Sequence, residues 1–259
     1  MATPWIAALF ALFIWWFSTG AILYVVRRAE NRPGCHGRAV MWGLPALVAG
    51  TVATTLSLSM PSVAGVYLGF LGALAIWGWI ELAFLTGIVT GPNRTPLAEG
   101  HSEWGRFLKA TGTVAYHEAL LLAGFLTLVL AAPAAENTIA AWTFGVLYIA
   151  RISAKLNLYF GVPRINTEFI PTPLAHLPSH FRIARMNWVF PLSIAGLTLA
   201  VVVGVQALGV ATSPAETAGI ALVTALTALG LLEHWLMVLP LPDARLWRWM
   251  LPEPKAPQR

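Results

Sequence analysis

The sequence carries very little charge. Only 10% of its 259 residues are Asp, Glu, Lys or Arg, while 58% are hydrophobic. Ordinary soluble domains contain about 25% charged residues, so a soluble protein of this length could not cover its surface with so few. The composition therefore excludes a soluble globular fold and predicts an all-α, polytopic integral membrane protein.

The sequence has a single cysteine and no phosphate-binding loop motif. The single cysteine, Cys35, excludes an internal disulfide framework and a cysteine-rich metal site. The chain has no G-x-x-x-x-G-K-S/T loop, so we expect no ATP hydrolysis, and it has no internal repeat of the kind that transporters often carry. The formal net charge of +5 does not indicate a nucleic-acid partner, because the basic residues are distributed in a different pattern, described below.

Long apolar runs fill most of the chain. Each is long enough to cross about 30 Å of hydrocarbon as a helix. We therefore predict a bundle of seven transmembrane helices within one domain, residues 1–242. The runs cover residues 4–26, 39–59, 63–88, 106–132, 138–159, 187–210 and 215–239.

The basic residues lie on one side of this predicted bundle. All sixteen Lys and Arg lie in or beside the first–second, third–fourth and fifth–sixth connections, or in the tail. The other three connections carry none. Positive residues accumulate on the cytoplasmic side of membranes, so we predict that the amino terminus lies outside and the carboxyl terminus inside. Membrane lipid is then the first expected partner.

The tail, residues 243–259, has a different composition. Trp247 and Trp249 lie beside Arg245 and Arg248, a mixture typical of the headgroup zone. The Pro-rich end that follows is typical of disorder. We predict an interfacial anchor that runs into a disordered cytoplasmic end.

Ionisable residues inside the predicted helices are the main functional signal. The sequence Tyr116-His117-Glu118 is the centre of this group, because it lies within an apolar run. An ionisable group at such a depth costs about 2.5–3.5 kcal/mol on insertion scales, so it persists only with a partner, a ligand or a wet cavity. All of these residues fall in the cytoplasmic half, and we expect them to converge between helices. The cluster is Glu81, His117, Glu118, Arg151, Lys155, Glu233 and His234.

Three interpretations of this cluster stay open. The first is an internal ion-pair network in which Arg151 or Lys155 balances the glutamates. The second is a transition-metal site made by His117, Glu118, Glu233 and His234, since imidazole and carboxylate ligate Zn, Fe and Mn. Di-iron bundles space Glu and His by three residues on one face, whereas these pairs are adjacent and about 100° apart. The third is axial ligation of a bacteriochlorophyll magnesium or a haem iron by His117 or His234.

The fifth–sixth connection is unusually long, at about 27 residues, and long ordered loops are usually functional. His176 and His180 would share a face if the segment were helical, but Pro178 between them argues against a regular helix. We predict a cytoplasmic docking or lid segment over the cluster. Its candidate residues are Asn157, Arg164, Glu168, His176 and His180.

Several short motifs resemble one family. They are Trp15-Trp16-Phe-Ser-Thr-Gly20, Gly78-Trp-Ile-Glu81-Leu-Ala-Phe-Leu-Thr-Gly87, Tyr116-His117-Glu118, and Lys155-Leu-Asn157 through Gly161-Val-Pro163 to Leu174-Ala-His176-Leu. The chain resembles the PuhE family, photosynthetic complex assembly proteins of purple bacteria that are encoded beside the reaction-centre H subunit. The resemblance implies a bacterial inner membrane, cytoplasmic or intracytoplasmic, and brings with it no established active site.

Two functions from different classes follow. The resemblance implies an assembly factor for the reaction centre and its light-harvesting ring, or a modulator of bacteriochlorophyll supply. Its partners would be those subunits or the pigment. The alternative is a membrane metalloenzyme that acts on a pigment or lipid precursor through the intramembrane His and Glu residues. We favour the non-enzymatic function and expect either bacteriochlorophyll or a transition metal if a cofactor is bound.

Overall fold

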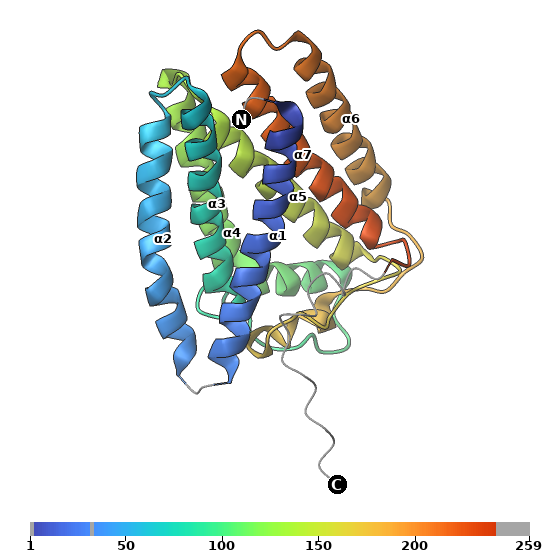
Figure 1. The fold of residues 1–259 in the computed structure, drawn as a ribbon. Coiled ribbons are helices and arrows are strands. Elements are labelled where there is room, and N and C mark those ends of the chain that lie inside the picture. Colours follow the sequence, from blue (N-terminus) through green and yellow to red (C-terminus); the bar gives the residue numbers. More distant parts are fainter. Residues whose placement is uncertain (1–2, 32–33, 242–259) are drawn as a thin grey trace.

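A computed structural model describes residues 3–31 and 34–241, and these residues form long helices and their connections (Figure 1). Seven of the described helices are long and apolar enough to cross a membrane, which makes the chain an all-α, multi-pass membrane protein. They are α1 (Pro4–Glu30), α2 (Cys35–Ser57), α3 (Val63–Leu85), α4 (Glu103–Ala131), α5 (Ile139–Phe160), α6 (Val189–Val210) and α7 (Pro214–Leu236). The predicted tail, 243–259, and Arg32 lie outside the described residues.

The helix ends differ from the predicted runs where charged residues occur. Helix α1 continues to Glu30 rather than ending at residue 26, and α2 begins at Cys35 rather than residue 39. Charge stops an apolar run but does not stop helical hydrogen bonding, because long basic side chains can extend to the membrane surface. Helices α3, α4 and α7 each begin after a serine whose hydroxyl accepts a backbone N–H bond, a preferred helix start.

Helices α3 and α7 occupy the middle of the bundle, between α1 on one side and α5 on the other. Small residues allow the close approach that helix packing in membranes requires. At Gly72 of α3, an added Cβ would lie 2.4 Å from the hydroxyl of Thr54 on α2. Two apolar clusters fill the interior, one around Phe70 and Leu222 and the other around Leu121 and Phe144.

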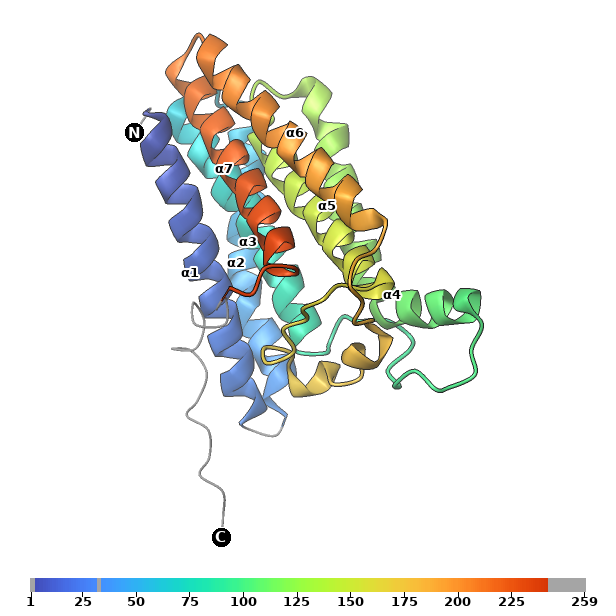
Figure 2. The same ribbon diagram turned by 90° about the vertical axis from the view of Figure 1, so that its right-hand side faces the viewer.

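Helix α4 bends where the preceding connection reaches into it. The carbonyl of Gly112 accepts a bond from the N–H of Asn93 (3.0 Å), and the N–H of His117 donates to the carbonyl of Thr90 (2.9 Å). Groups that enter the helical ladder in this way are a common cause of kinks. Figure 2 shows the first turns of α4 lying across the end of the bundle. The approach requires glycine at Gly91, where an added Cβ would lie 2.1 Å from the Gly112 carbonyl oxygen.

The long α5–α6 connection folds over the same end of the bundle (Figure 2). It contains two short 3₁₀ helices, η2 (Thr172–Leu174) and η3 (Leu177–His180), so the segment that holds Pro178 is not a regular α-helix. Helix α1 holds the connection through Arg27 Nη2, which donates to the carbonyl of Glu168 (2.9 Å), and through Glu30, which accepts from the N–H of Thr172 (2.5 Å). The segment therefore covers the end of the bundle across which the first turns of α4 lie, while its cytoplasmic location and its function as a lid stay predictions.

Candidate functional site

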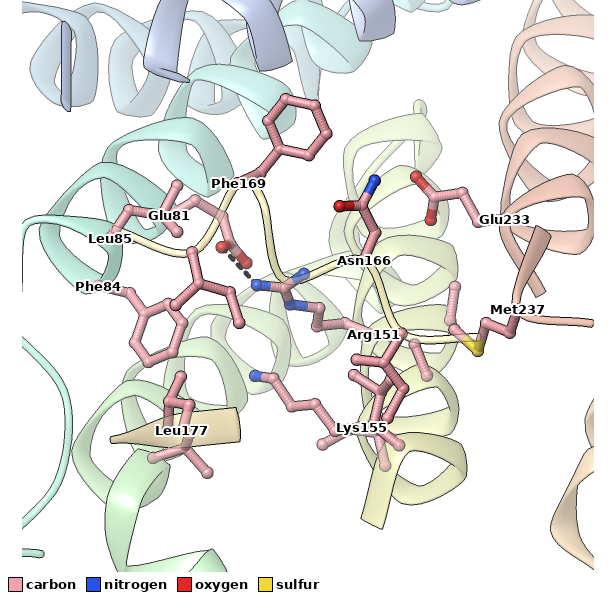
Figure 3. Close-up of a pocket in the computed structure, with 18 of the residues that line it drawn as sticks. Glu81, Phe84, Leu85, Arg151, Lys155, Asn166, Phe169, Leu177, Glu233 and Met237 are labelled. Atoms are coloured by element: carbon pink, nitrogen blue, oxygen red, sulfur yellow. Dashed lines mark hydrogen bonds and ion pairs between the residues drawn. The ribbon is translucent and has the colours of Figure 1, made fainter. Parts of the chain in front are cut away.

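A cavity of about 1290 Å³ lies among α1, α3, α4, α5 and α7, beneath the α5–α6 connection. Most of its lining is apolar and aromatic, with Trp15, Trp77, Phe84, Phe107 and Phe169 among the larger side chains. Charged side chains from four of these helices also reach it, and Figure 3 shows several of them around one space. They are Glu81, Glu118, Arg151, Lys155 and Glu233.

An ion pair joins α5 to α3 inside this cavity. Arg151 Nη2 lies 2.9 Å from Glu81 Oε2, and the Glu81 side chain is largely buried (Figure 3). A charge-assisted bond between a guanidinium and a carboxylate is about twice as strong as a neutral one. The pair therefore neutralises a carboxylate that would otherwise be costly at this depth.

A second ion pair joins α5 to α4. Lys155 donates to Glu118 and lies 5.5 Å from the centroid of the Phe84 ring. Arg151 and Lys155 are one helical turn apart and share a face of α5, yet they reach different partner helices. The structure thus contains the ion-pair network of the first interpretation, and the network connects α3, α4 and α5.

Glu233 on α7 differs from the other two cavity glutamates. Its side chain is exposed at the cavity, and Figure 3 shows it directed from α7 toward Asn166 of the α5–α6 connection. Within residues 3–31 and 34–241, no ion pair or hydrogen bond reaches its carboxylate. The sequence predicts Arg151 or Lys155 as its counter-ion, but each of those bases is bonded to a different glutamate.

Residues 1–258 match the family described as "Protein of unknown function (DUF3623)". The chain belongs to this family. It is also 49% identical over 258 residues to an "Uncharacterized 30.4 kDa protein in puhA 5'region" of Rhodobacter capsulatus, a match that covers 99% of this chain and 94% of that protein. No solved structure matches the chain.

In this DUF3623 member, His117 is fully buried beside the cavity and does not line it. Its ring stacks on Phe84 at a centroid distance of 4.3 Å, and Nε2 lies 3.7 Å from Glu81 Oε1. Neither ring nitrogen has a hydrogen-bond partner among the described residues. A macrocycle would need open space in front of a ring nitrogen, and the packing around His117 offers none in this conformation.

His234 points away from the cavity into a polar network between helices. Its Nδ1 lies 2.7 Å from the Gly230 carbonyl and its Nε2 lies 2.8 Å from Ser153 Oγ. Ser153 also bonds Ser193 Oγ (2.7 Å), to which Asn157 donates (2.9 Å). Because both nitrogens are engaged, His234 connects α7 to α5 and α6 rather than presenting a ligand. Adjacent Glu233 faces the cavity, as the angular separation of neighbours on a helix predicts.

The structure does not bring the four predicted metal ligands together. Glu118 is bonded to Lys155, His234 to Ser153, and His117 has only Glu81 nearby. Across the part of the chain that the structure describes, no group of three or more His, Cys, Asp or Glu could hold a metal ion. The donor set therefore does not fit a transition-metal site in this conformation.

The predicted loop residues divide between the cavity and its surroundings. Arg164 and His180 line the cavity, whereas Asn157, Glu168 and His176 do not. Arg164 donates to the carbonyls of Leu239 and Leu241 after the end of α7. His180 Nε2 lies 3.3 Å from the Thr95 carbonyl, and burial lowers the pKa of both His176 and His180.

Sequence reasoning missed several polar residues of the site. Ser153, Ser193 and Asn187 complete the network around Asn157, and Asn166 faces Glu233. Ser153 and Asn157 are four residues apart on α5, a spacing that signals a shared polar face. Hydroxyl residues are nevertheless ordinary in membrane helices, and their partners lie on helices whose packing the sequence does not specify.

Proposed function

We propose that this chain is a non-enzymatic assembly factor of a bacterial photosynthetic membrane, which holds an amphiphilic cargo in the cavity between its helices. The observation that carries this proposal is the cavity of about 1290 Å³, with aromatic walls and charged groups on several helices. Its volume exceeds the range of about 300–1000 Å³ typical of small-ligand pockets. A pigment, a pigment precursor or the apolar segment of a subunit has the required size and character.

The charge arrangement favours holding a cargo over transforming it. Glu81 and Glu118 are bonded to Arg151 and Lys155, so two of the three cavity glutamates are already paired with a cation of the protein itself. A general acid or base needs a proton-transfer partner on the substrate within hydrogen-bond reach. The paired groups instead serve to connect the helices that form the cavity walls. The metalloenzyme alternative gains no support from the donor geometry.

The photosynthetic setting rests on the relative and on the motifs. The relative from Rhodobacter capsulatus is described by its place in the puhA 5' region, and the match covers nearly the whole of both chains. Together with the PuhE-like motifs, this supports a cargo that belongs to the reaction centre and its light-harvesting ring, or to the bacteriochlorophyll supply. We place the chain in the inner membrane with its amino terminus outside, residues 1–242 as the bundle and 243–259 as a cytoplasmic tail.

A cavity-filling variant tests this proposal. An added Cβ at Gly78 meets only Ile22, at 3.4 Å, so a larger side chain there can extend into the cavity. Gly196 on α6 has nothing within 4 Å of an added Cβ and does not line the cavity, which makes it a matched control. Each variant replaces the gene in a photosynthetic bacterium that carries this protein. Absorbance of the assembled complexes and mass spectrometry of pigments and lipids that co-purify with the protein are then measured.

We expect Gly78→Leu to lose the co-purifying cargo and to lower complex accumulation, because it occupies space that the cargo needs. Gly196→Leu should behave as wild type. Full complex accumulation and unchanged cargo in a stably inserted Gly78→Leu protein would refute a cargo function for the cavity.

A further inference from the structure

Among the described residues, one carboxylate of the cavity, Glu233, makes no ion pair or hydrogen bond, although the charge of Arg151 acts on it. Arg151 is bonded to Glu81 and Lys155 to Glu118, each across a helix–helix boundary. Arg164, at the cavity edge, donates to backbone carbonyls beyond α7. In the described ranges, 3–31 and 34–241, Glu233 has neither an ion pair nor a hydrogen bond. An ionisable residue inside a membrane span marks a functional position by default, because its insertion is costly.

The side chain of Glu233 is placed to meet a ligand. It lines the cavity from α7, and Figure 3 shows it directed toward Asn166 and away from the ribbon of its own helix. The same view shows the guanidinium of Arg151 turned toward Glu81 on the opposite side of the cavity. The space beside Glu233 is therefore polar on one side, while the rest of the cavity wall is mainly apolar and aromatic.

We propose that Glu233, with Asn166 beside it, forms a head-group subsite that binds the positively charged ammonium group of an amphiphile, whose apolar body lies against the aromatic walls. This rests on the proposed function, because it takes the cavity to be a ligand site. An ionised carboxylate only accepts hydrogen bonds, so its natural partner is a charged donor. An ammonium group would pair with Glu233 without competing for Arg151 or Lys155, which already form ion pairs with Glu81 and Glu118.

Matched probes test the subsite directly. The purified chain is placed in phosphatidylcholine nanodiscs and titrated with three dansyl-labelled alkyl amphiphiles that differ only in their head groups: ammonium, hydroxyl or sulfonate. Energy transfer to dansyl from the tryptophans of the protein, of which Trp15 and Trp77 line the cavity, reports binding. We expect the ammonium probe to bind about tenfold more tightly than the hydroxyl probe, which corresponds to about 1.4 kcal/mol. The sulfonate probe should bind most weakly.

Two variants assign the preference to one side chain. Glu233→Gln keeps the shape and removes the charge, so it should lose the preference for ammonium, and Glu233→Asp should keep it. Glu216→Gln is the matched control, because Glu216 lies in the first turn of the same helix, is bonded to Thr212 and does not line the cavity. Its probe preference should equal that of wild type.

The possible outcomes distinguish the proposed head-group subsite at Glu233 from ligand binding by the cavity as a whole. Equal binding of the three probes by wild type, or an ammonium preference that survives in Glu233→Gln, would overturn the subsite and leave cavity binding intact. Failure of every probe to bind would count against the proposed function as well. The wild-type comparison decides the question even if Glu233→Gln does not accumulate. Added phosphatidylethanolamine distinguishes the sources: competition indicates a bilayer lipid head group, and no competition indicates a free amphiphilic amine.

Discussion

Arg151 on α5 and Glu81 on α3 are 70 residues apart in sequence, and their side chains meet at 2.9 Å inside the bundle. The His117 ring nitrogen lies 3.7 Å from the other Glu81 oxygen, and Lys155, which is bonded to Glu118, also interacts electrostatically with Glu81. Arg151 is therefore the partner that offsets the Glu81 charge. Removing Arg151 leaves the largely buried Glu81 without its ion-pair partner, and removing Glu81 leaves the partly exposed Arg151 without its own.

The first prediction follows from this pair. Glu81→Gln should lower the free energy of unfolding by about 3 kcal/mol, the lower end for buried pairs, because Arg151 is partly exposed to the cavity. Thermal unfolding of the purified protein measures the loss. The double variant Glu81→Gln with Arg151→Met should recover part of it, since no uncompensated charge remains. A double variant no more stable than Glu81→Gln would mean that the pair is not the cause.

The bend of α4 gives a second prediction. Gly91→Ala should destabilise the protein by about 1–3 kcal/mol, because the new Cβ would overlap the Gly112 carbonyl and force the connection out of α4. Gly37→Ala is the control, since an added Cβ there has nothing within 4 Å. Accumulation in the membrane and thermal unfolding are compared for the two variants. Equal stability of both would show that the α3–α4 connection does not have to enter the helix.

A third prediction concerns pH and the α5–α6 connection. Burial lowers the pKa of His176 and His180, so the folded connection favours neutral imidazoles. The unfolded segment then binds more protons, and stability rises with pH. The histidines contribute fully above the ordinary pKa of about 6.5, and the contribution is lost as pH falls below it. The protection factors of residues 161–188 in hydrogen exchange, which divide out the pH dependence of intrinsic exchange, should therefore fall on acidification. The double variant His176→Gln with His180→Gln should lack this dependence.

The polar network around His234 gives a fourth prediction. Ser153→Ala removes the partner of His234 Nε2 and should cost about 1–3 kcal/mol, because a buried acceptor or donor is left unsatisfied. Binding of the ammonium probe should not change, since neither residue of this bond belongs to the proposed head-group subsite. A loss of probe binding at unchanged stability would instead place the network in the ligand site.

Orientation is the subject of the fifth prediction. The one-sided basic residues predict that the amino terminus lies outside. A reporter that is active only in the cytoplasm should therefore be active when fused after Arg259 and silent when fused at Glu136. The reverse pattern would invert the bundle and place the cavity end, with its ion pairs, on the outer side.

The sequence predicts the helices well because their signal is local. Each apolar run is long enough to span a membrane, and every predicted run corresponds to a helix in the structure. The intramembrane charges also predict a shared interior location. Which charges pair is not local information, because it depends on how α5 packs against α3 and α4. Glu233 is an example. The sequence predicts Arg151 or Lys155 as its counter-ion, but in the structure these two residues form ion pairs with Glu81 and Glu118.

The α4 bend escapes prediction for a different reason. Its bonds are made by backbone groups of Thr90, Asn93, Gly112 and His117, and backbone groups leave no residue-type signature. Gly91 and Gly112 are sequence traces of this contact, and single glycines in a connection or a helix have many explanations. From the sequence, a ligand function for the two histidines stays open because imidazole is a common metal ligand. Only three-dimensional packing shows that His117 stacks on Phe84 and that His234 bonds to Ser153.

Helix α1 has two structural roles that its sequence alone does not indicate. It forms one wall of the cavity, with the side chains of Trp15, Ser18, Thr19 and Ile22. Its Arg27 and Glu30 also hydrogen-bond to the α5–α6 connection, which covers the end of the bundle. An outward tilt of α1 would break its hydrogen bonds to the connection and open the cavity wall in one movement. Under the proposed function, one movement of α1 would therefore open the cavity both at the side of the bundle and at the end that the connection covers.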